Sequence, residues 1–154
     1  MMLGFWVVFL VGGLVTAWRV HTKLQPMIAA DPALEPGGRV LVRTIVVLVL
    51  VMVAVNGGLQ YFGGFTDPGW WAQRGFEDPY VVVLFVFQLL FTGVILWWVW
   101  IANGPARLFK YRAAFSDFQN PMNLGERGLR WVLTCLPIAG LLIFVLNIVK
   151  RGGK

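Results

Sequence analysis

The four longest apolar runs of this 154-residue chain lack Asp, Glu, Lys and His throughout their interiors. These runs cover residues 3–18, 40–55, 80–102 and 131–149, and Arg43 lies just inside the second. Transport coupled to protons or sodium usually relies on an ionisable side chain that faces the interior of a helical bundle. The lack of such side chains argues against coupled transport by this chain alone.

Cysteine and histidine are equally scarce, with one of each, Cys135 and His21. A single cysteine excludes a disulfide within the chain, and its place in the fourth run predicts a small packing residue. A single histidine excludes a haem held by two histidines of this chain, and copper or di-iron sites need clusters of ligands within spans. No nucleophile motif or phosphate-binding loop occurs. We therefore predict no cofactor and no catalytic activity for this chain alone.

Hydrophobic residues make up 58% of the chain and charged residues only 13%, unlike the composition of a soluble domain. A hydrocarbon core of about 30 Å requires about 20 helical residues, which the runs supply together with their interfacial neighbours. The sequence predicts an all-α membrane protein, with four transmembrane helices, short loops and one interfacial amphipathic helix in a single domain over 1–154. The expected spans cover residues 3–20, 40–61, 80–102 and 131–149. A soluble bundle is disfavoured because these runs have no polar face.

Basic residues are concentrated in the loop between the first two spans (loop one), the loop between the last two (loop three) and their flanks. These residues are Arg19, Lys23, Arg39, Arg43, Arg107, Lys110, Arg112, Arg127 and Arg130. Because cytoplasmic loops are enriched in Lys and Arg, we predict a bacterial inner (plasma) membrane protein with both termini extracytoplasmic. The basic tail favours an alternative with three spans and one re-entrant or interfacial segment, which would place the tail in the cytoplasm. The first run has no preceding cation, which favours a retained span over a signal peptide.

The net charge of +6 comes mostly from cations beside the spans, where they set orientation and meet anionic head groups. We therefore predict no nucleic-acid partner. In loop three, Leu108 and Phe109 can face lipid while Arg107, Lys110 and Arg112 reach head groups, which predicts the interfacial helix at about 105–118. Segments 31–39 and 120–128 share a similar residue pattern ahead of a span, which either a repeat of parallel hairpins or chance explains.

Two places in the spans could bind a polar ligand. Arg43 can extend to the interface, either as an orientation anchor or as a contact for a lipid or quinone head group. Arg19 and His21 are expected at the same depth and could share that site. Gln88 is the most conspicuous polar residue at a span centre. The simplest explanation for Gln88 is an interhelical hydrogen bond, and the alternative is that it lines a substrate or quinone pocket.

Loop two, between the second and third spans, is the most distinctive segment of the chain. Trp70 and Trp71 suit a membrane interface, which makes an aromatic belt the simplest explanation. The alternative is a docking surface for a basic partner, formed by these rings with the carboxylates of Asp67, Glu77 and Asp78. A metal site there is disfavoured because no His or Cys lies nearby.

Small residues in the spans suit close packing of helices, either within the four-helix unit or against another subunit. The eight Trp and twelve Phe can fill gaps between subunits, although aromatic belts explain part of their number. We therefore expect an accessory or structural, non-catalytic subunit of a larger bacterial membrane complex, of which a bioenergetic complex is one example. Its partners would be other membrane subunits, lipids and quinone. The alternatives are a small oligomeric transporter or channel, and a quinone-linked redox subunit whose cofactor lies in a partner.

Overall fold

The computed structural model describes residues 2–67, 70–115 and 125–152, in which the backbone forms helices and turns and no strand. The elements in chain order are α1 (Met2–Ala30), η1 (Pro32–Leu34), α2 (Glu35–Met52), η2 (Val53–Gly57), α3 (Gly58–Phe62), η3 (Trp70–Gln73), α4 (Pro79–Trp100), α5 (Gly104–Phe109), η4 (Arg112–Phe115) and α6 (Gly125–Gly152). Of the short elements, η1, η3 and η4 are 3-10 turns and η2 is a single π-helical turn.

Four helical stretches are long and apolar enough to cross a membrane. They are Gly4–Ala30, Pro32–Phe62, Pro79–Trp100 and Gly125–Lys150. At about 1.5 Å per residue, each is longer than the roughly 30 Å of a hydrocarbon core. The prediction of an all-α membrane protein with four spans is therefore confirmed.

The first helix extends about ten residues beyond the span predicted from hydropathy, from residue 20 to Ala30. Pro26 lies inside this extension without ending the helix. The helix stops at Asp31, whose extended backbone allows its carboxylate to accept a hydrogen bond from the Ala33 amide at 3.1 Å. This cap opens η1, so α2 begins at Glu35 and folds back along α1.

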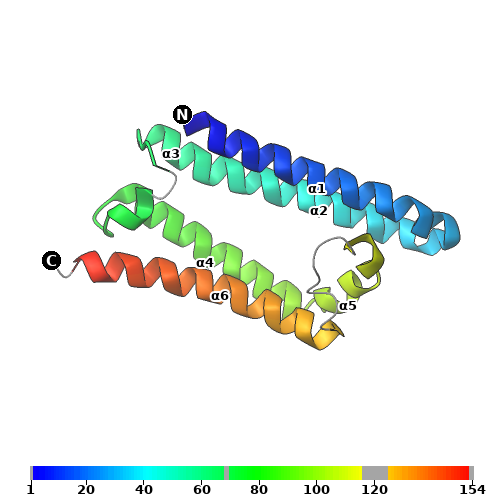
Figure 1. The fold of residues 1–154 in the computed structure, drawn as a ribbon. Coiled ribbons are helices and arrows are strands. Elements are labelled where there is room, and N and C mark those ends of the chain that lie inside the picture. The colour runs from blue at the N-terminus through cyan, green and yellow to red at the C-terminus, as the bar shows by residue number, and fades with distance from the viewer. Residues whose placement is uncertain (1, 68–69, 116–124, 153–154) are drawn as a thin grey trace.

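The long helices form two antiparallel pairs, which Figure 1 shows lying side by side. The first hairpin consists of α1 and the continuous stretch α2–η2–α3, and the second consists of α4 and α6. Both chain ends lie at the same end of the molecule as the segment between α3 and α4, while α5 lies at the opposite end (Figure 1). The two hairpins therefore run in parallel, as a repeat would require, although residues 120–124 of the second repeated pattern fall outside the described ranges.

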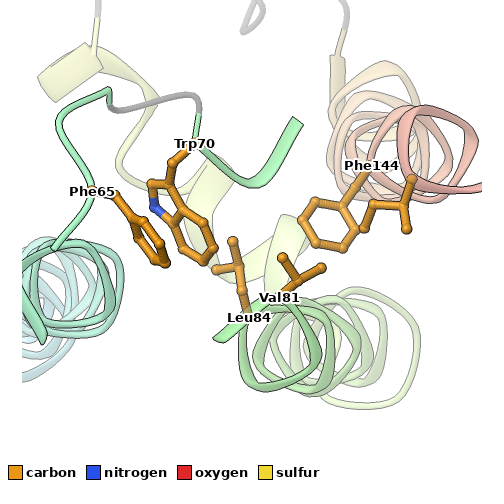
Figure 2. Packing of buried hydrophobic residues seen from close by; sticks show 6 residues of the cluster. Phe65, Trp70, Val81, Leu84 and Phe144 are labelled. Atoms are coloured by element: carbon orange, nitrogen blue, oxygen red, sulfur yellow. The ribbon is translucent and has the colours of Figure 1, made fainter. Parts of the chain in front are cut away.

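Aromatic residues between α3 and α4 join the two hairpins at one end. A loop-two cluster of buried side chains comprises Phe65, Trp70, Val81, Leu84, Phe144 and Ile148. Figure 2 shows Phe65 and Trp70 approaching Val81 and Leu84 of α4, with Phe144 of α6 beside them. The Tyr80 hydroxyl also donates a hydrogen bond to the Phe62 carbonyl at 3.2 Å, from the start of α4 to the end of α3.

At the other end, the segment after α4 packs against the first hairpin. A hairpin-one cluster contains Val20, Leu24, Tyr111 and Ala114, with Phe115 partly buried against it. The helix predicted at 105–118 is divided here into α5 and η4, separated by a turn at Lys110 and Tyr111, and residues 116–118 fall outside the described ranges. The break occurs because Tyr111 and Ala114 turn inward to reach α1 and α2.

Candidate functional site

The three residues predicted to contact a head group lie at similar depth but not on one face. Gly13 lies against Val49 and Leu24 against Gly38 in the first hairpin, and the same antiparallel register places Arg19 level with Arg43. Both arginines are exposed. Arg19 and His21 are two residues apart, so their side chains project about 160° apart around α1. His21 instead lies 3.3 Å from the Gln25 side chain. Head-group contact by each residue stays a prediction.

Gln88 lies on the face of α4 that packs against α6. The buried residues of α4 are Val81, Leu84, Thr92 and Val99, at spacings of three, eight and seven positions. Gln88 lies four residues from both Leu84 and Thr92, so it falls on the same stripe of the helix. Its side chain is half-buried and makes no hydrogen bond within the described part of the chain. A role for Gln88 in lining a substrate or quinone pocket stays a prediction.

The two tryptophans of loop two pack inward. Trp70 is only 4% exposed and stacks on Phe65 with ring centroids 4.1 Å apart. Trp71 is half-buried, and its ring centroid lies 4.9 Å from that of Phe144. The guanidinium of Arg74 covers the Phe65 ring at 4.3 Å. These contacts give both tryptophans a structural role between the hairpins, and docking through them stays a prediction.

The three loop-two acids differ in how far they are engaged within the chain. Asp78 caps α4 by accepting a hydrogen bond from the Tyr80 amide at 2.9 Å, and it pairs with Arg74 at 2.6 Å. Asp67 accepts a hydrogen bond from the side-chain Nε2 of Gln73 at 2.9 Å. Glu77 is exposed and has no hydrogen-bond or ion-pair partner among the described residues. Of the three, Glu77 is thus the acid most available to a basic partner.

A polar contact that the sequence did not reveal joins the ends of the first hairpin. The Trp6 indole N–H donates a short hydrogen bond to the Gln60 side-chain oxygen. Gln60 is 2% exposed, and its Nε2 has no hydrogen-bond partner in the described ranges. The π turn η2 ends three residues before Gln60, and its last residue, Gly57, lies against the Trp6 ring. In the sequence, Asn56 and Gln60 are two polar residues one helical turn apart near the end of a span, which indicates a polar contact there. The sequence does not identify Trp6 on α1 as the partner of Gln60.

A cleft of about 410 Å³ lies between the two hairpins at the α5 end of the molecule. One side of the cleft is formed by α2, through Pro36, Gly37, Val40, Leu41 and Thr44. The other side is formed by the end of α4 and the α5 segment, through Trp98, Arg107, Leu108, Lys110 and Tyr111. The lining is mainly apolar, with two cationic side chains and two hydroxyl groups. Chemically, such a cleft can hold an amphiphile with an anionic or polar head.

Within residues 2–67, 70–115 and 125–152, no group of three His, Cys, Asp or Glu is placed to hold a metal ion. The cysteine predicted to be a packing residue, Cys135, is exposed on α6. Comparison of the chain with protein-family models, curated proteins and solved structures found no match in any of the three. What the chain binds is therefore inferred from its own geometry.

Proposed function

We propose that this protein is a non-catalytic subunit of a larger membrane complex, in which its two hairpins pack against helices of partner subunits. The observation that carries the proposal is the small share of the spans that the chain buries within itself. The apolar 18-residue stretch of Pro32–Phe62 contains no buried residue, and the share reaches only 17% in Pro79–Trp100. Helices that bury so little of their surface against one another leave long faces for lipid or for other helices.

The exposed faces are rich in large side chains on all four helices. Val8 is 71% exposed on α1, Val47 is 55% exposed on α2, Leu90 is 65% exposed on α4 and Leu142 is 55% exposed on α6. Lipid tails cover such faces without specificity, whereas helix association in a bilayer depends on close van der Waals packing. A subunit whose own helices form only pairs suits assembly around or between partner helices.

The proposed location is the bacterial inner membrane, with the α5 end in the cytoplasm. The support is the distribution of charge: nine of the 13 Lys and Arg residues lie either between the last part of α1 and the first part of α2, or between α5 and the start of α6. The ends of the chain and the segment between α3 and α4 lie at the opposite end (Figure 1). Lys and Arg favour the cytoplasmic side of short loops.

The proposal can be tested by extracting the protein from its native membrane with a mild detergent and measuring the particle mass. We expect a particle heavier than one chain that contains other polypeptides in fixed ratio. Substitution by Trp at Val8, Val47, Leu90 and Leu142, one position at a time, should release the partner in at least one variant. Lipid accommodates an added ring, whereas a packed helix interface does not.

Each variant is compared with the wild-type chain for helical content, which separates loss of the partner from loss of the fold. A particle with the mass of a single chain and no co-purifying polypeptide would overturn the proposal. A homo-oligomer that conducts ions in liposomes, with flux abolished by Gln88→Leu, would instead identify a channel.

A further inference from the structure

The cleft between the hairpins has a shape that is fixed by contacts within the chain. The Tyr111 hydroxyl donates a hydrogen bond to the Leu34 carbonyl at 3.2 Å, which holds the turn after α5 against the start of α2. Tyr111 lies directly on Gly37, where an added Cβ would overlap its hydroxyl. On the same side of the cleft as Tyr111, the Trp98 ring lies on Gly104 in the same way. The two glycines therefore let aromatic rings set the width of the cleft.

The two cations of the cleft, Arg107 and Lys110, are not neutralised by the acids described at this end of the molecule. Glu35 pairs with Arg39 at 3.0 Å, and Glu126 pairs with Arg130 at 3.2 Å. The Asp31 carboxylate caps η1. Both cleft cations are exposed and have no ion-pair partner within the described ranges. The cleft therefore carries net positive charge beside an apolar wall.

The position of the cleft matches the depth at which a lipid head group meets its acyl chains. Its α2 wall begins at Pro36 near the start of one candidate span, and Trp98 lies in the last turn of another. Trp and Tyr rings favour this level of a bilayer. Cations placed there attract anionic lipid head groups. The apolar wall can contact an acyl chain, but it offers no favourable interaction to a free anion.

We propose that this cleft binds one anionic phospholipid, with its phosphate on Arg107 and Lys110 and an acyl chain along Val40, Leu41 and Trp98. The lipid would bridge the hairpins, since α2 contacts the chain and the α5 segment contacts the phosphate. A quinone lacks the negative charge that the two cations select, and inorganic phosphate lacks the chain. This inference goes beyond the proposed function, because binding needs no partner subunit.

The experiment titrates the purified protein, in a neutral mild detergent, with phosphatidylglycerol or with phosphatidylcholine of the same acyl chains. Native mass spectrometry counts the lipids bound to each chain. We expect one phosphatidylglycerol to be retained at concentrations where phosphatidylcholine is not. The Arg107→Gln/Lys110→Gln variant should bind phosphatidylglycerol about tenfold more weakly or worse.

The matched control is Arg112→Gln/Arg127→Gln, which removes two exposed cations from the same end without touching the cleft lining. It should leave the affinity within about twofold, because screening weakens distant charges. A second variant, Val40→Trp, fills the apolar wall without changing charge and should also abolish retention. Its control is Val51→Trp, at an exposed position outside the cleft on the same helix.

Helical content and thermal unfolding of each variant establish that it is folded. Equal retention of the two lipids would overturn the proposal, as would an equal loss of affinity in the double variant and its control. Displacement of phosphatidylglycerol by millimolar inorganic phosphate would show that the cations bind free anions, and it would overturn the proposal as well. None of these results depends on whether partner subunits exist, so this test and that of the proposed function fail independently.

Discussion

At the residue scale, Trp6 and Gln60 provide a partly buried polar contact between the two sides of the first hairpin. Replacing Gln60 with Leu leaves the Trp6 N–H without its acceptor, and an unpaired buried donor costs about 1–3 kcal/mol. In membrane proteins the measured coupling between such partners is smaller, about 1 kcal/mol. We therefore expect Gln60→Leu to destabilise the protein by about 1 kcal/mol in a reversible unfolding titration in mixed micelles.

The double-mutant cycle with Trp6→Phe separates the hydrogen bond from the packing. The variant that carries both changes should be more stable than the sum of the single losses predicts, because neither polar group is then left unpaired. Gln88→Leu is the matched control, since Gln88 is half-buried without a hydrogen bond among the described residues. Additive losses at Trp6 and Gln60 would show that the contact contributes nothing.

Gly37 gives a second prediction at this scale, because its lack of a side chain lets Tyr111 approach α2. A Cβ at this position would overlap the Tyr111 hydroxyl, while the ring carbon behind it lies 3.0 Å away. We expect Gly37→Ala to destabilise the chain by about 1–3 kcal/mol, the usual cost of overpacking. Adding Tyr111→Phe should recover part of this loss.

The control for Gly37→Ala is Gly12→Ala on α1, where an added Cβ meets nothing within 4 Å. There the higher helix propensity of alanine should leave the stability unchanged or slightly improve it. Equal effects at the two glycines, measured by the same unfolding titration, would contradict a close approach of Tyr111.

At the scale of elements, loop two packs as a small core rather than as a loose connection, and this separates two roles for its residues. Trp70→Ala should destabilise the isolated chain by about 3–5 kcal/mol, because it empties a buried site between Phe65 and α4. Glu77→Gln should leave the stability of the isolated chain unchanged, because Glu77 is exposed. Thermal unfolding of the purified protein measures both effects.

The same two variants test docking through loop two. Loss of a partner in Glu77→Gln, with normal stability, would support a basic partner at this surface. Stability that is unaffected by Trp70→Ala would contradict the buried position of this ring and would restore an exposed belt as its explanation.

The sequence predicts those elements that depend on local composition, and it misses those that depend on contacts between distant parts of the chain. The spans follow from length and hydropathy, so all four appear as expected. The extension of α1 to Ala30 was missed because Lys23, Gln25 and Pro26 resemble a loop, whereas packing of Leu24 against Gly38 keeps this part helical. Long-range contacts of this kind override local propensity.

The break between α5 and η4 has the same origin. An amphipathic pattern over 105–118 predicted one interfacial helix, but Tyr111 is drawn to the Leu34 carbonyl. Similarly, the aromatic character of Trp70 predicted a membrane interface, and its burial against Phe65 depends on how α3 and α4 are placed. The residue types predicted that these side chains make important contacts, and only the tertiary structure identifies the residues that they contact.

At the scale of the whole molecule, the parallel arrangement of the two hairpins connects the charge pattern to the orientation in the membrane. The ends of the chain lie with loop two, and the opposite end includes η1 and η4 (Figure 1). A four-span protein places these two ends on opposite sides of a bilayer. Which end is cytoplasmic follows, as a prediction, from the excess of Lys and Arg around α5.

Cysteine labelling can test this orientation, because Cys135 is the chain's single thiol and its replacement by Ser gives a cysteine-free background. Single cysteines are then introduced at the exposed positions Glu77, Ala33 and Ala113. With intact bacterial cells and a membrane-impermeant maleimide, we expect labelling at Glu77→Cys alone. Ala33→Cys and Ala113→Cys should react only after permeabilisation, because the basic residues around them resist translocation across the membrane. The opposite pattern would invert the orientation, and labelling of Ala33→Cys and Ala113→Cys from different sides would contradict four spans.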